Sequence, residues 1–283
     1  MELFSATRNG APSRKPLRVL CLHGFRTSAA FLQQQLLNKW DKSLLDELLV
    51  LTFLDAPFPC KGKSDVEGIF PPPFYEWFQY NIIFTEFTGL EECIWYISNY
   101  MFEHGPFDGL LGFSQGAVLC AALVGLQQKG LALLKHPPLR FVLVISGAMF
   151  KNIKVKEDCY SDIIRCPSVH FIGSKDWLKP KNEELRQVFE EPIIVRHGAK
   201  HTIPRLDKEA IGVLRDFLRS VQTSKDRHLE GTDNASEYRE ATNEGVLQEQ
   251  HRLEVTDNSI EFRGAKREGL PHEDCLLQIE VAA

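Results

Sequence analysis

The chain has 283 residues, a formal net charge of −5, 43% apolar residues and 25% charged residues. That length suits one α/β domain of average size with an extension outside its core, and no stretch reaches the roughly twenty apolar residues that span a bilayer. The acidic balance offers no general attraction for phosphate backbones, which argues against nucleic acid as a partner and favours a small-molecule ligand.

Residues 1–16 form a short N-terminal arm that contains arginines and serines. It lacks the apolar core of a secretory signal peptide. The seven cysteines are scattered and form no C-x-x-C pair, which is typical of free thiols in a reducing compartment. We therefore expect a cytoplasmic protein, with the nucleus as an additional location.

Residues 17–222 alternate short apolar runs with longer segments of helical period, which predicts parallel strands joined by crossover helices. The expected strands are apolar throughout, as in a sheet covered by helices on both faces. They are Leu17 to Leu22, Leu49 to Leu54, Asp108 to Phe113, Leu139 to Ile145, Ser168 to Ile172 and Pro192 to Arg196. The expected helices are Ala29 to Trp40, Gly89 to Glu103, Gln115 to Gln128, Lys181 to Glu190 and Asp207 to Val221.

One insertion, residues 57–88, interrupts this alternation with prolines followed by a concentration of aromatic side chains. An insertion of that length is usually a functional cap or binding loop. Phe74, Trp77 and Phe78 are therefore candidate walls of a substrate pocket, although aromatic stripes also serve simply as core.

A polar tail, residues 223–283, follows the last expected helix and contains only Tyr238 and Phe262 as aromatic residues. It buries too little apolar surface to offset its ordering entropy, so we expect disorder. A helix within Asn243 to Val255 is the alternative.

The strongest motif is Gly112-Phe-Ser-Gln-Gly116, which lies between an expected strand and an expected helix. This is the order of a nucleophile elbow, in which a serine sits on a strained turn and flanking glycines let strand and helix pass closely. The pattern predicts an α/β-hydrolase fold with Ser114 as the nucleophile. The alternative is that Ser114 only caps the helix.

The oxyanion hole is expected from two backbone N–H groups, those of Phe25 and Gln115. Phe25 follows a His-Gly pair at the end of the first strand, where this fold supplies its second oxyanion donor. His23 itself precedes the elbow, so it is expected to be structural or to border the substrate pocket rather than act as the base.

His201 is the expected general base, because it lies in a loop after the last strand, from which an imidazole reaches the sheet edge. His197, closer to the strand end, is the alternative. Asp176 is the expected acid, because it leaves the preceding strand, and Asp158 and Asp162 are weaker candidates that precede that strand.

These residues resemble the FSH family of serine hydrolases over about Leu17 to Val221. The resemblance rests on the run from Gly105 to Ala117, on Gly173-Ser-Lys-Asp176 and on His197-Gly-Ala-Lys-His-Thr-Ile-Pro204. It implies the same triad, Ser114, Asp176 and His201, and carboxylesterase activity on fairly long acyl chains. Lys200 departs from the family pattern, which usually has a small residue there.

The sequence thus predicts an ester hydrolase of the α/β-hydrolase fold, with a mostly parallel sheet and an aromatic-rich cap. Medium or long acyl esters are the expected substrates, and no cofactor or metal is expected because no nucleotide or zinc motif is present. Two alternatives remain open: a thioesterase that uses the same triad, and a scaffold that binds a small molecule with little activity.

Overall fold

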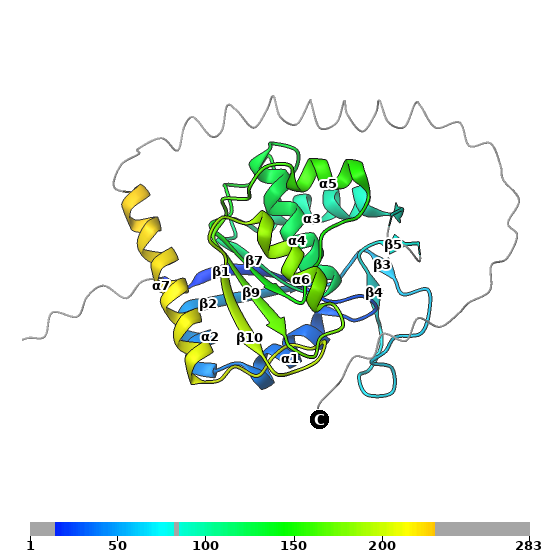
Figure 1. Ribbon diagram of the computed structural model, residues 1–283, viewed down its shortest axis with the longest axis horizontal. Helices are drawn as coiled ribbons and strands as arrows, with labels where there is room; N and C mark the ends of the chain where they lie inside the picture. The colour runs from blue at the N-terminus through cyan, green and yellow to red at the C-terminus, as the bar shows by residue number, and fades with distance from the viewer. Residues whose placement is uncertain (1–14, 82–84, 230–283) are drawn as a thin grey trace, which may run out of the picture.

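The computed structural model describes residues 15–81 and 85–229. Six parallel strands form the central sheet in the order β10-β9-β8-β7-β1-β2. Their bounds are β1 Leu17–Leu22, β2 Leu49–Leu54, β7 Gly109–Phe113, β8 Phe141–Ile145, β9 Ser168–Gly173 and β10 Ile193–His197. The expected α/β-hydrolase fold with helices on both faces of a parallel sheet is confirmed (Figure 1).

Two layers of helices cover the sheet (Figure 1). One layer consists of α3 Leu90–His104, α4 Gln115–Gln128, α5 Ile153–Tyr160 and α6 Lys179–Leu185, which a 3-10 turn at Arg186–Val188 extends. The other consists of α1 Ala29–Lys39, α2 Lys42–Leu48 and α7 Lys208–Leu229.

Alternate side chains of each strand enter two separate hydrophobic clusters. Leu20 and Leu110 pack under the layer of α3 to α5, whereas Val19, Leu111 and Leu143 pack under α1, α2 and α7. Because successive strand residues point to opposite faces, a strand covered on both sides must be apolar throughout. This is why the inner strands appear in the sequence as continuous apolar runs.

Two short helices were not expected from the sequence. The Asp41 carboxylate caps α2 by accepting from the Leu44 N–H at 2.8 Å, and the Asn152 side chain caps α5 by accepting from the Val155 N–H at 3.1 Å. Both capping residues were readable signals, but helices of seven and eight residues show too few turns for their period to stand out. The last helix, α7, also runs to Leu229, past the expected domain boundary at residue 222.

The described part of the insertion contains two small antiparallel strand pairs. β3 Phe58–Pro59 pairs with β4 Tyr75–Glu76, and β5 Gln79–Tyr80 pairs with β6 Phe87–Thr88. Residues 82–84, most of the N-terminal arm and the tail from 230 onward lie outside the described residues, so the expected disorder of the tail stays a prediction. None of the helices in the described ranges is long and apolar enough to cross a membrane.

Candidate active site

Ser114 occupies a strained bend between β7 and α4. Its backbone has φ 53° and ψ −116°, a region that residues with a side chain rarely adopt. The bend is held on both sides, because the Ser114 N–H donates to the Ile145 carbonyl at 2.9 Å and the Ser114 carbonyl accepts from the Val118 N–H at 3.0 Å. The serine is therefore presented at the carboxyl end of the central strands.

The two glycines of the pentapeptide are required by close backbone approach. A Cβ atom at Gly112 would lie 2.4 Å from the carbonyl oxygen of Gly116, and one at Gly116 would lie 2.1 Å from the carbonyl oxygen of Leu22. Both distances are far below van der Waals contact, so a larger residue at either position would separate α4 from the sheet. The glycines thus hold the bend close to the end of β1.

The structure brings the three expected triad side chains together. The Ser114 hydroxyl contacts His201 Nε2 at 2.9 Å, and His201 Nδ1 contacts Asp176 Oδ1 at 3.0 Å. The His201 side chain is only 2% exposed and that of Asp176 is fully buried. With a proton on His201 Nδ1, the ring donates to the carboxylate and its Nε2 accepts from the serine.

Sheet topology explains why residues so far apart in sequence meet. Asp176 follows β9 and His201 follows β10, and these strands are parallel neighbours with Gly173 opposite His197. The carboxyl ends of parallel strands open at one edge of the sheet, where ligands of open α/β folds bind. The loops are joined there, since the Ser174 N–H donates to the His197 carbonyl at 2.8 Å.

Opposing effects act on the Asp176 carboxyl, and together they lower its pKa. Burial alone would raise the pKa, but the hydrogen bond and the charge of His201 and the hydrogen bond from the Leu178 N–H favour the ionised form. The Leu178 N–H donates to Asp176 Oδ1 at 2.8 Å. The carboxylate beside the imidazole therefore stays ionised at neutral pH.

Among the described residues, no histidine other than His201 is hydrogen-bonded to Ser114. Burial lowers the pKa of His23 to about 4 and that of His170 to about 3. His23 Nε2 accepts from the Ala56 N–H at 3.0 Å, which braces the loop after β2. His197, the alternative base, has no hydrogen-bond partner on either ring nitrogen among the described residues.

Ser114 opens into a cavity of about 350 Å³. Phe25 and Gln115 both line it, and as the first residue of α4 Gln115 has a backbone N–H with no acceptor inside the helix. Apolar side chains from three segments form much of the wall: Phe78, Tyr80, Phe87, Val118, Met149 and Phe150.

Only one of the four expected pocket residues, Phe78, belongs to this wall. Trp77 is completely buried, and its Nε1 donates to the His23 carbonyl at 2.8 Å. Phe74 packs against the cluster under α1 and α7, and His23 is buried beside Trp77 with 5.0 Å between the rings. Phe74, Trp77 and His23 therefore do not line the cavity at Ser114, which corrects the expectation for them. Adjacent residues of the insertion point in different directions, and His23, after β1, is held in the interior by its contacts with Ala56 and Trp77.

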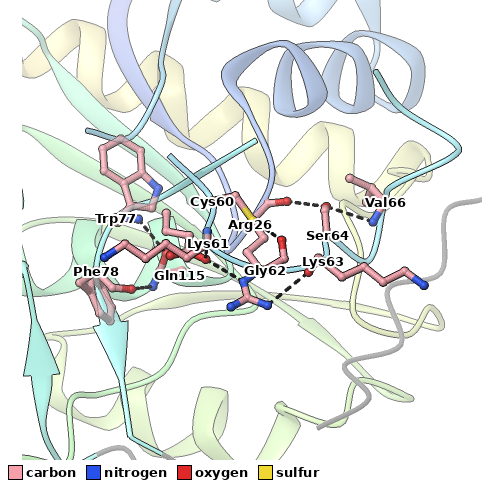
Figure 2. A network of polar contacts seen from close by, with 11 residues as sticks. Arg26, Cys60, Lys61, Gly62, Lys63, Ser64, Val66, Trp77, Phe78 and Gln115 are labelled. Atoms are coloured by element: carbon pink, nitrogen blue, oxygen red, sulfur yellow. Dashed lines mark hydrogen bonds and ion pairs between the residues drawn. The ribbon is translucent and has the colours of Figure 1, made fainter. Parts of the chain in front are cut away.

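The insertion is attached to the elbow by polar contacts (Figure 2). The Gln115 side-chain oxygen accepts from the Trp77 N–H at 3.1 Å, and its amide nitrogen donates to the Phe78 carbonyl at 2.8 Å. Arg26 Nε, next to Phe25, pairs with the buried Glu76 carboxylate at 2.7 Å. The loop that presents Phe78 is thereby tied to both expected oxyanion donors.

Five of these wall residues were not expected from the sequence: Tyr80, Phe87, Val118, Met149 and Phe150. Tyr80 and Phe87 belong to the aromatic insertion, so their composition was a usable signal. Met149 and Phe150 follow β8, whose carboxyl end meets the same sheet edge. Their position after a central strand was the signal that pointed to them.

The fold and the chain of contacts from Ser114 define a serine hydrolase of the α/β-hydrolase fold. A family model described as serine hydrolase (FSH1) matches residues 13–212. The chain belongs to this family, and it is an enzyme that acts on ester bonds.

The chain is similar to the human protein named Esterase OVCA2, with 35% identity over 211 residues that cover 68% of this chain and 91% of the relative. It is also 29% identical over 229 residues to a Schizosaccharomyces pombe protein named dihydrofolate reductase. That match covers 75% of this chain but only 49% of the relative, so the chain spans about half of it. Among solved structures, Arabidopsis thaliana SOBER1 has a TM-score of 0.49 and 16% identity, covering 73% of this chain and 99% of SOBER1.

Proposed function

We propose that the protein is a carboxylesterase that cleaves esters with medium or long acyl chains through Ser114, His201 and Asp176. The observation that carries the proposal is the unbroken contact chain from hydroxyl to imidazole to carboxylate, at 2.9 Å and 3.0 Å. The imidazole between these partners is positioned to remove the serine proton.

In the acylation step, Ser114 Oγ attacks the ester carbonyl while His201 Nε2 takes the hydroxyl proton. Asp176 stabilises the resulting imidazolium, and the N–H groups of Phe25 and Gln115 stabilise the oxyanion. His201 then donates the proton to the leaving oxygen, which releases the alcohol and forms the acyl-enzyme. Water then attacks the acyl carbonyl while His201 Nε2 takes its proton. His201 returns that proton to Ser114 Oγ, so the acid leaves and the serine hydroxyl is restored.

The cavity supports the proposed acyl preference. Its wall combines aromatic rings from the insertion, including Phe78 and Phe87, with Val118 of α4 and Phe150 after β8. An apolar wall favours the transfer of an alkyl chain from water by about 0.8 kcal/mol per methylene group. A short acetyl group would leave most of this surface unused.

A fluorophosphonate probe tests the role of Ser114. Wild-type protein should be labelled and the Ser114→Ala variant should not, because the probe reacts only with an activated serine. Ser98→Ala is the matched control, since this hydroxyl lies on α3 and donates to the Ile94 carbonyl at 2.8 Å. Equal labelling of wild type and Ser114→Ala would refute the proposal.

A substrate panel tests the ester class and the acyl preference together. Oxygen esters and thioesters of matched chain length, from acetyl to palmitoyl, should show higher kcat/KM for oxygen esters and for medium or long chains. A preference for thioesters at every length would instead indicate a thioesterase with the same triad.

A further inference from the structure

A second cavity of about 520 Å³ lies beside the active-site cavity, between α3, α4 and α5. The two cavities have two lining residues in common, Phe87 and Phe150. Phe87 comes from β6 in the insertion and Phe150 follows β8, so two distant segments meet at this boundary. The pair therefore borders the active-site cavity on one side and the second cavity on the other.

The wall is closed by direct ring contact. The rings of Phe87 and Phe150 lie edge to face, with centroids 4.8 Å apart and planes at 85°. Phe78 completes the cluster, with its ring centroid 5.6 Å from that of Phe87 and 5.4 Å from that of Phe150. Phe150 is 3% exposed, so the residue that borders both cavities is almost entirely shielded from bulk solvent. Edge-to-face packing of this kind is a favourable arrangement for aromatic pairs.

The lining of the second cavity is mixed, with apolar side chains beside charged ones. Its apolar lining residues are Ile94 of α3, Leu126 of α4, Leu131 in the loop after α4, and Val155 of α5. Glu91, Glu92 and Asp158 also line this cavity, together with Lys154. Acidic groups disfavour an anionic headgroup there, whereas the apolar residues suit methylene groups.

We propose that the Phe87–Phe150 pair is the end wall of the acyl pocket and sets the longest acyl chain that the enzyme cleaves efficiently. This inference rests on the proposed carboxylesterase function. The carbonyl is held at Ser114, so the acyl chain extends along the apolar wall until it reaches the two rings. A longer chain must separate the rings or leave its terminal methylene groups in water.

Removal of one ring should connect the two cavities. In Phe150→Ala, methylene groups beyond the normal limit enter the second cavity, and each buried group raises kcat/KM about fourfold. We expect the ratio of kcat/KM for palmitoyl to butyryl p-nitrophenyl esters to rise at least about tenfold over wild type. Phe150→Leu, which fills much of the same volume, should raise the ratio less.

Phe189→Ala is the matched control for loss of a buried aromatic ring. Phe189 is 4% exposed, packs in the same hydrophobic cluster and is absent from the described lining of either cavity. It should lower the melting temperature as Phe150→Ala does, without changing the palmitoyl-to-butyryl ratio. Melting curves of both variants establish that the proteins compared are folded.

Filling the second cavity with a side chain tests whether long acyl chains enter that cavity or whether loss of the Phe150 ring only makes the active-site cavity more flexible. Val155→Trp places a large side chain in that cavity, so in the Phe150→Ala background it should abolish the gain on the palmitoyl ester. Val155→Trp alone should leave the wild-type ratio as it is, because the wall is intact.

The outcomes distinguish this inference from the proposed function. The end-wall proposal is wrong if folded Phe150→Ala and Phe150→Leu proteins cleave butyryl esters and keep the wild-type palmitoyl-to-butyryl ratio. That result would not contradict the proposed esterase function. A gain that persists in the Phe150→Ala, Val155→Trp double variant would also overturn the end-wall proposal. Failure of wild-type protein to cleave any ester would refute the proposed function itself.

Discussion

The side-chain amide of Gln115 donates to the backbone carbonyl of Phe78 at 2.8 Å. The residue that offers a backbone N–H to the proposed oxyanion hole thus also fixes, through its side chain, the segment that lines the acyl cavity. The same amide accepts from the Trp77 N–H, so the insertion contacts the elbow through both halves of one side chain (Figure 2). Under the proposed function, Gln115 therefore links the oxyanion hole to the wall of the acyl cavity.

Replacement of Gln115 by Ala keeps its backbone N–H but leaves the Trp77 N–H and the Phe78 carbonyl unpaired. Each buried unpaired group costs about 1–3 kcal/mol, so the melting temperature should fall by several degrees. Because Phe78 loses its anchor, kcat/KM should fall more for octanoyl than for acetyl esters. Thermal melts and a chain-length series measure both effects.

Gln128→Ala is the matched control for that prediction. Gln128 ends the same helix, and its amide likewise bridges a loop, donating to the Ile163 carbonyl at 2.9 Å and accepting from the Arg165 N–H at 2.8 Å. It should lower stability without altering the octanoyl-to-acetyl ratio. An unchanged ratio in Gln115→Ala would show that the amide only stabilises the fold.

Asp176→Asn should lower kcat by roughly 10⁴-fold, because an amide neither stabilises the imidazolium nor holds the proton on His201 Nδ1. The substitution conserves size, so the melting temperature should stay within a few degrees of wild type. Steady-state kinetics and a thermal melt are sufficient measurements. A loss of kcat smaller than tenfold would exclude Asp176 as the acid.

Stability should decline as the pH falls from about 6.5 to about 4, because of two buried histidines. Burial lowers the pKa of His23 from 6.5 to about 4 and that of His170 from 6.5 to about 3. In this window the unfolded chain binds more protons than the folded protein, so the free energy of unfolding decreases with decreasing pH. Each histidine contributes roughly 1.4 kcal/mol per pH unit.

Urea denaturation at pH 7, 6 and 5 measures this slope. His170→Leu should reduce it, because the leucine has no proton to gain on unfolding. His170 contacts the Ser168 hydroxyl at 3.1 Å, so a lower stability at pH 7 is also expected. An identical slope in the variant would assign the acid sensitivity to other groups.

Gly116→Ala should prevent stable folding or lower the free energy of unfolding by roughly 3 kcal/mol or more, because its Cβ would meet the Leu22 carbonyl oxygen at 2.1 Å. The matched variant is Gly212→Ala in α7, where a Cβ meets no atom within 4 Å. It should be neutral or stabilising by up to about 1 kcal/mol. Soluble yield and urea denaturation compare the two, and equal stabilities would contradict the packing argument.

The sequence alone determined the layers of the fold and the edge at which the site lies. Strands β1 and β2 have the bounds expected from their apolar runs, because burial on both faces of a sheet demands such runs. Parallel strands open at one edge, so the positions of Ser114, Asp176 and His201 after their strands indicated that these residues would meet. That inference requires only connectivity and period.

Only the tertiary structure decided which aromatic side chains face the nucleophile. Trp77 and Phe78 are adjacent in an aromatic run, yet Trp77 is buried against His23 while Phe78 lines the cavity. Phe150 reaches the same wall from a segment after β8. Side-chain direction in an irregular insertion depends on contacts with distant segments, and those contacts leave no periodic trace in the local sequence.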